Sequence, residues 1–308
     1  MFSNYALSTS ETCRKLCAEQ ERQGSKNPET TIYIYVSHIL LCQSIKEMTV
    51  YTIASGKGGV GKTTFALNMG AALSELGMRT LVIDCDIGMA NLGLMINLES
   101  KKIVSLHEVL AGKVEDVSEA INQTSYGMDV LLSGISIRGF KQADPEKLRE
   151  AVEKLVDEYE FILLDSPAGI SKESMVPLAV SDEVILITNP ELPSVTDTLK
   201  TKLMTGIVER KIRGTVVNRV MGAKGELAAS KIEELLEVEV LGVIPNDINV
   251  TKAVAFKVPV VVRMPGSPAA KRIKEIARKL AKLETSEDSG KYGFVERLLG
   301  AFRKITKS

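Results

Sequence analysis

The feature that most constrains the fold is a glycine-rich stretch, SGKGGVGKTT at residues 55–64, which lies between two apolar segments. The segment before it, MTVYTIAS, has the near-continuous apolar character of a buried strand. The segment after it, TFALNMGAALSELG, has helical periodicity and ends on Gly77, a residue type that often follows a helix C-terminus. The stretch is therefore predicted to be a tight loop that joins a buried strand to a helix.

This loop has the spacing of a phosphate-binding site. Its sequence fits G-x-x-x-x-G-K-[ST] from Gly56 to Thr63. Glycines let backbone N–H groups wrap a phosphate, and the N-terminus of the following helix adds partial positive charge. We expect the loop to bind the phosphates of a nucleotide, with Lys62 on the β- and γ-phosphate oxygens and the Thr63 hydroxyl as a ligand of Mg²⁺. The expected nucleotide-binding residues of the loop are Lys57, Gly58, Gly59, Val60, Gly61, Lys62, Thr63 and Thr64.

The chain between Met48 and residue 283 alternates apolar strands with helical segments. Near-continuous apolar strands that alternate with helices indicate a mostly parallel sheet covered by helices on both faces. The sequence thus predicts an α/β fold of the P-loop NTPase type, in one domain over 48–283. Further strands are expected at 79–86, 128–133, 160–167, 182–190, 212–220 and 239–247, and further helices at 145–157, 194–210, 226–236 and 267–283.

Acidic residues at two strand ends complete the predicted site. LVIDCD ends in Asp84 and Asp86, and FILLD ends in Asp165. Because the carboxyl ends of parallel strands face one crevice, these carboxylates are expected beside the phosphate loop. We assign Asp84 and Asp165 to the Mg²⁺ site, Asp165 acting through water, and Asp86 to orienting the attacking water. Taken singly, each aspartate is also compatible with a solvated strand-end carboxylate of no special role.

A second lysine, Lys57, gives the loop the form KGGVGKTT, which resembles the deviant phosphate loop of the MinD/ParA family of P-loop ATPases. The resemblance runs from Met48 to Glu284 through IDCDIGMANLGL, LLDSPAGI, VVNRV and GVIPND, in the family's order. It implies that two subunits enclose two ATP molecules and that Lys57 reaches the nucleotide of the opposite subunit. A cation delivered in this way stabilises phosphoryl charge only in the assembled dimer. A solvent-exposed loop lysine is the alternative.

The same resemblance implies where the adenine lies. Asn218 and Arg219 of VVNRV, together with Pro245 and Asp247 of VIPND, match the family's adenine-contacting segments. The chain has IPND where the family usually has IPED. The catalytic residues that the resemblance and the strand-end argument together predict are Lys57, Lys62 and Asp86.

The N-terminal segment differs from the middle of the chain. Residues 1–47 show no continuing alternation of strands and helices. We expect them to be an unstructured extension, or a segment that the native protein lacks.

The C-terminal segment has a membrane-binding pattern. An acidic linker over 284–292 precedes residues 293–308, in which apolar side chains fall on one helical face and cations lie beside it. We predict that this face binds membrane lipid; packing on the domain or on a partner protein is the alternative. The predicted lipid-facing residues are Phe294, Val295, Leu298, Leu299 and Phe302.

Composition narrows the classes of function. Lysine plus arginine and aspartate plus glutamate both number 39, so a general basic field for nucleic acid is absent, although local patches are possible. The four cysteines form no zinc or cluster spacing, which indicates a reducing cytoplasm and argues against an iron–sulfur carrier.

The function that these observations favour is an ATP-hydrolysing switch. We expect it to form a homodimer on ATP binding, to attach from the cytoplasm to the inner face of the cell membrane, and to position cell-division or polar assemblies. An activating protein, which the sequence does not identify, is expected as a partner. The alternative is a partition ATPase of the same family, whose dimer binds DNA nonspecifically.

Overall fold

The structure is a computed structural model that describes residues 48–86, 91–98, 103–134 and 145–283. The predicted N-terminal extension, the linker and the C-terminal membrane helix lie outside the described residues. In the described part of the chain, no helix is both long and apolar enough to cross a membrane.

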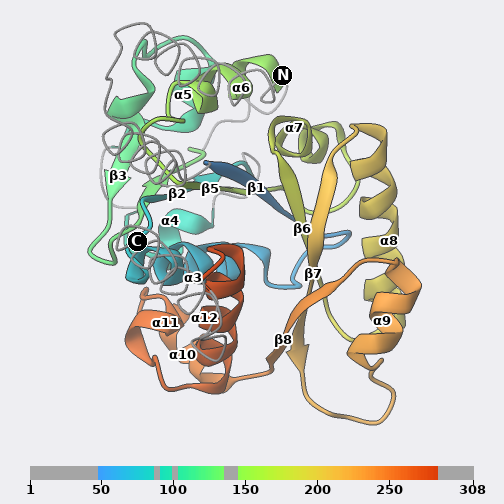
Figure 1. Cartoon of the computed structure of the whole chain (residues 1–308). Helices are drawn as coiled ribbons and strands as arrows, with labels where there is room; N and C mark the ends of the chain where they lie inside the picture. Colours follow the sequence, from blue (N-terminus) through green and yellow to red (C-terminus); the bar gives the residue numbers. More distant parts are fainter. Residues whose placement is uncertain (1–47, 87–90, 99–102, 135–144, 284–308) are drawn as a thin grey trace, which may run out of the picture. The chain divides into compact units, whose positions relative to one another are not determined.

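The described strands form one sheet in the order β3-β4-β2-β5-β1-β6-β7-β8 (Figure 1). β3 pairs antiparallel with β4, whereas β2 and β5, β1 and β6, and β6 and β7 pair in parallel. The predicted mostly parallel sheet is therefore confirmed. The strands are β1 (Thr49–Ala54), β2 (Thr80–Asp84), β3 (Ile121–Gln123), β4 (Asp129–Leu131), β5 (Phe161–Asp165), β6 (Glu183–Thr188), β7 (Lys211–Val220) and β8 (Val240–Pro245).

All seven strands expected from the sequence are present, and β3 is an addition. β3 is a short edge strand, INQ, whose largely polar residues carry no strand signal. The predicted helices correspond to α3, α6, α8, α9 and α12, with ends that differ by a few residues. The described helices are α3 (Lys62–Glu75), α4 (Leu92–Met95), α5 (Leu106–Leu110), η1 (Val117–Ala120, a 3₁₀ helix), α6 (Pro145–Glu153), α7 (Lys172–Val180), α8 (Leu192–Ile207), α9 (Ala229–Leu236), α10 (Ile248–Ala255), α11 (Val260–Arg263) and α12 (Pro268–Leu280).

Helices cover both faces of the sheet (Figure 1). In β6, Ile185 and Ile187 belong to the core that also contains residues of α3 and α12. Val184 and Leu186 point the other way and pack with side chains of α7 and α8. Successive residues of a strand face opposite sides, so an entirely apolar strand needs a helical layer on each side. This arrangement leaves the carboxyl edge of the sheet as the place where polar side chains can gather.

Candidate nucleotide-binding site

The phosphate loop leads from the end of β1 directly into α3. Gly61, the residue before α3, has a left-handed backbone with φ of 101°, which glycine adopts without steric cost. No side chain caps the N-terminus of α3, and its first turn holds no acidic residue. The first N–H groups of α3 and the positive end of its dipole are therefore available to an anion.

The start of the loop lies against α8. A Cβ atom on Gly56 would collide with the backbone carbonyl of Asp197 in the second turn of α8. Glycine is therefore required at this position by a close approach of two backbones, and not only by the conformation of the loop. This contact fixes the N-terminal part of α8 beside the phosphate loop.

Lys62, the first residue of α3, is 8 % exposed. Burial lowers the pKa of its ammonium group, while the negative charges of Asp165 and Asp86 act in the opposite direction. A cation held at the N-terminus of a helix and largely shielded from water interacts strongly with an anion. Lys62 thus lies next to the acidic residues of the site, and its contact with phosphate oxygens stays a prediction.

Two carboxylates lie side by side at the carboxyl edge of the sheet. Asp84 of β2 and Asp165 of β5 are direct partners in the strand pairing, and both are 1 % exposed. Burial, and to a smaller extent the nearby charge of Asp165, raises the pKa of Asp84 to about 8. Burial also raises the pKa of Asp165, to about 6, against the lowering effects of a Thr63 hydrogen bond and the Lys62 charge.

The surroundings of this acidic pair fix the position of Asp84. The Ser133 hydroxyl donates to Asp84 Oδ2 over 3.1 Å, and the Asp86 N–H donates to Asp84 Oδ1 over 3.0 Å. Both oxygens of Asp84 therefore have partners within the chain, and its contact with Mg²⁺ stays a prediction. Sequence reasoning did not find Ser133, although it lies just beyond the carboxyl end of β4, where a strand-end rule would place a site residue.

The residues beside the loop fit a magnesium ion. The Oδ1 atom of Asp165 is buried and has no hydrogen-bond partner, and the Thr63 hydroxyl interacts with the same carboxylate. Mg²⁺ prefers oxygen ligands and usually takes only one or two carboxylates together with waters and phosphate oxygens. Among the described residues, no cluster of three or more histidine, cysteine or acidic side chains could hold a metal by itself. Asp165 and Thr63 would therefore hold Mg²⁺ together with a bound phosphate, whose charge the ion would neutralise.

A cleft of about 460 Å³ continues from the phosphate loop along the ends of β7 and β8. All four residues predicted to surround the adenine line this cleft, next to Gly61 and Thr64 of the loop. Asn189 and Glu191 also line it, and the sequence analysis missed them, although they follow the carboxyl end of β6. The lining residues are Gly61, Thr64, Phe65, Asn189, Glu191, Asn218, Arg219, Met221, Ile244, Pro245, Asn246, Asp247, Val250, Thr251 and Ile273.

Two of the predicted adenine contacts already bind other parts of the chain. The side-chain amide of Asn218 donates to the Val60 carbonyl over 2.7 Å. The Asp247 carboxylate accepts from the N–H groups of Asn249 and Ala269, over 2.9 and 3.1 Å, and so joins the start of α10 to the start of α12. A contact of either side chain with adenine stays a prediction, whereas their places in the wall of the cleft are clear.

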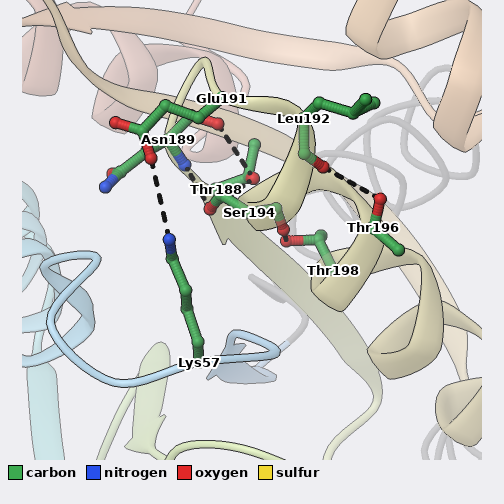
Figure 2. A network of polar contacts seen from close by, with 8 residues as sticks. All are labelled: Lys57, Thr188, Asn189, Glu191, Leu192, Ser194, Thr196 and Thr198. Atoms are coloured by element: carbon green, nitrogen blue, oxygen red, sulfur yellow. Dashed lines mark hydrogen bonds and ion pairs between the residues drawn. The ribbon is translucent and has the colours of Figure 1, made fainter.

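Lys57 points toward α8 (Figure 2). Its Nζ atom lies 3.6 Å from Oε2 of Glu191, the residue before α8, and the two side chains are 37 % and 53 % exposed. The turn that carries Glu191 is held by Ser194, whose hydroxyl oxygen accepts from the Asn189 N–H over 3.0 Å. The two lysines of the loop therefore have different surroundings: Lys62 is buried beside the acidic residues, and Lys57 is at the rim.

A glycine-rich phosphate loop at the carboxyl edge of a mostly parallel sheet, with a buried acidic pair beside it, defines a P-loop nucleotide-binding protein. Residues 51–260 match the family described as the CobQ/CobB/MinD/ParA nucleotide binding domain. The chain belongs to the MinD/ParA family of P-loop ATPases.

Proteins of similar sequence and structure support this family assignment. An uncharacterized ATP-binding protein of Methanocaldococcus jannaschii is 43% identical over 249 residues, which are 80% of this chain and 94% of that protein. The crystal structure of the cell division ATPase MinD of Pyrococcus furiosus has a TM-score of 0.72 and 35% identity, covering 77% of this chain and 99% of that one. The septum site-determining protein MinD of Pyrococcus horikoshii, complexed with Mg-ADP, has a TM-score of 0.72 and 33% identity, covering 77% and 97%.

Proposed function

We propose that this chain is an ATP-hydrolysing switch that dimerises on ATP binding, attaches to the inner face of the cell membrane through residues 293–308, and positions a division or polar assembly. The solved structures of cell-division and septum-site proteins, at 35% and 33% identity, support the class of process. The chemistry within one subunit is assigned to Lys62 on the phosphates, Asp165 and Thr63 on Mg²⁺, and Asp86 on the attacking water.

The observation that carries the proposal is the different placement of the two loop lysines. Lys62 lies buried beside Asp165, and we assign it to the phosphates of its own subunit. Lys57 pairs with Glu191 at the rim of the cleft and is partly exposed. A partly exposed ion pair contributes little to stability and is easily exchanged for another partner. Lys57 is thus placed to leave Glu191 and serve the nucleotide of a second subunit.

The surface around the cleft supports a second copy of the chain as the partner. Five large apolar side chains, each at least half exposed, follow the carboxyl ends of five different strands. The carboxyl ends of the strands form the edge of the sheet that carries the phosphate loop, and we infer that these apolar groups belong to an interaction surface there. A dimer that encloses ATP at this edge would bury them. They are Leu94, Ile170, Leu192, Met221 and Ile248.

Dimerisation gives the C-terminal segment its proposed role. A single short amphipathic helix binds lipid only marginally, whereas two such helices on one particle bind with greater avidity. ATP binding would then favour membrane attachment, and hydrolysis would release the protein to the cytoplasm. An activating protein partner would act on the hydrolysis step.

The test measures assembly and lipid binding together. Sedimentation velocity of the full chain should show a dimer with a non-hydrolysable ATP analogue and a monomer with ADP. Anionic liposomes should pellet the protein only with the analogue, and the double variant Phe294→Asp, Leu298→Asp should stay dimeric but fail to pellet. A monomer at saturating analogue would refute the proposal. Salt-sensitive DNA binding without lipid binding would favour the partition ATPase instead.

A further inference from the structure

We propose that Asn218 is a positioning residue of the phosphate loop, and that its side chain holds the loop in shape. The observation is a direct hydrogen bond between segments 158 residues apart: Asn218 Nδ2 donates to the Val60 carbonyl over 2.7 Å. The inference rests on the proposed function only in that the cleft takes a nucleoside triphosphate.

The geometry of the peptide bond explains the effect on phosphate binding. In a planar trans peptide, the N–H group of one residue points away from the carbonyl of the residue before it. The Val60 carbonyl is directed to Asn218, so the Gly61 N–H is directed away from β7. Backbone N–H groups of such a loop are the donors to the phosphates. A single side-chain hydrogen bond therefore sets the direction of a phosphate donor.

An irregular backbone at the end of β7 directs the Asn218 side chain toward the phosphate loop. The register between β7 and β8 shifts between Val217 and Val220, and Arg219 between them has a left-handed backbone with φ of 59°. An irregularity of this kind re-aims a strand side chain, and a left-handed conformation is uncommon for arginine. The Arg219 N–H in turn donates to Asn218 Oδ1 over 3.0 Å. Both polar atoms of the Asn218 side chain are thereby held.

The loop is also shaped to receive this side chain. A Cβ atom on Gly61 would collide with Nδ2 of Asn218, so a glycine is needed there for the amide to approach. Val60 is 1 % exposed, which keeps its peptide group away from competing water.

Two ligands separate loop positioning from base reading. The affinities of Mg-ATP and of Mg-tripolyphosphate, which has no base, are measured by calorimetry for the wild type, Asn218→Ala and Asn218→Asp. We expect Asn218→Ala to weaken both ligands, the base-free tripolyphosphate included, by about three- to tenfold, as for loss of one neutral hydrogen bond. Asn218→Asp should weaken both at least as much, because it has the shape of asparagine but places an acceptor against the Val60 carbonyl.

A matched control lies outside the cleft. The side-chain amide of Asn122, in β3, also donates to a backbone carbonyl, that of Ala120, over 2.9 Å. Asn122→Ala should leave the tripolyphosphate affinity unchanged. If Asn218→Ala weakens ATP but not tripolyphosphate, or weakens neither, the positioning role is wrong.

A measurement without ligand keeps the inference separate from the proposed function. Amide hydrogen exchange in the loop peptide spanning 56–66 should be faster in Asn218→Ala and Asn218→Asp than in the wild type, and unchanged in Asn122→Ala. Equal exchange in all four proteins would overturn the inference. A wild-type protein that binds no Mg-ATP would instead overturn the proposed function, and the exchange comparison would still decide the role of Asn218.

Discussion

The ammonium group of Lys57 lies 3.6 Å from the Glu191 carboxylate, so within one subunit the phosphate loop is joined at its rim to the start of α8 (Figure 2). Both side chains are more than one third exposed, so this pair stabilises the fold by at most about 1 kcal/mol. The ion pair matters because it holds the Lys57 ammonium group beside the cleft and away from Asp84 and Asp165. The first prediction follows from this geometry.

Replacing Lys57 with alanine should separate nucleotide binding from assembly. We expect Lys57→Ala to bind Mg-ATP within about threefold of the wild type, because Lys62 and the loop backbone remain. We also expect the variant to lose dimerisation. Sedimentation velocity in the presence of a non-hydrolysable ATP analogue measures this loss. Lys231→Ala removes another exposed, ion-paired lysine, on α9, and should leave dimerisation intact. A Lys57→Ala protein that dimerises normally would contradict the cross-subunit role.

Replacing Lys62 should abolish binding itself. Lys62→Ala removes a buried cation at the helix N-terminus, and charged hydrogen bonds contribute about 1.5–3 kcal/mol each. We therefore expect the affinity for Mg-ATP, measured by calorimetry, to fall by about a hundredfold or more. Circular dichroism of the free variant serves as the control for folding. Binding reduced by less than a few-fold would show that the loop does not use this lysine.

Asp86→Ala should bind ATP but hydrolyse it slowly. The group that orients or deprotonates an attacking water typically contributes about a hundredfold or more to the rate. Phosphate release under single-turnover conditions should show this loss, and the variant should accumulate as a dimer with ATP itself. Asp157→Ala, an exposed aspartate just after α6, provides the control. Hydrolysis at the wild-type rate would remove Asp86 from the mechanism.

The buried acidic pair predicts a pH dependence of stability in the absence of Mg²⁺ and nucleotide. Asp84 has a pKa of about 8 in the folded protein, against about 3.9 in an unfolded chain. Between these values the folded state binds more protons, so the free energy of unfolding falls as the pH rises, by at most about 1.4 kcal/mol per pH unit for this group. Asp165, with a pKa of about 6, adds to the fall only below that pH.

Urea unfolding with EDTA at several pH values between 5 and 8 checks this dependence. Asp84→Asn keeps the shape of the side chain and removes its titration, so it should flatten the fall between pH 6 and 8. A parallel loss of stability in the wild type and in Asp84→Asn would show that Asp84 is ionised throughout this range.

Much of the fold could be predicted because its signals are local. Most strands of the parallel part of the sheet are short runs of apolar residues, and the long helices have clear periodicity. The phosphate loop was recognisable because its spacing is set by backbone geometry over a few residues. The strand-end rule also placed Asp84, Asp86 and Asp165 correctly at one edge, since the carboxyl ends of parallel strands share a crevice.

The segments that the sequence did not reveal are short or polar. β3 adds an edge to the sheet through backbone pairing with β4, which requires no apolar pattern. α7 contains Pro177 and lacks a strong apolar stripe, so its helical form depends on packing against its neighbours.

The sequence alone therefore determined the phosphate loop, the parallel sheet and the residues gathered at its carboxyl edge, because backbone conformation and apolar periodicity act between near neighbours. Only the tertiary structure decided that Asp84 and Asp165 are direct partners, that Lys57 pairs with Glu191, and that Asn218 holds the Val60 carbonyl. Each of these contacts joins residues far apart in the chain. Their partners depend on strand order and on a local irregularity in β7, which no local pattern encodes.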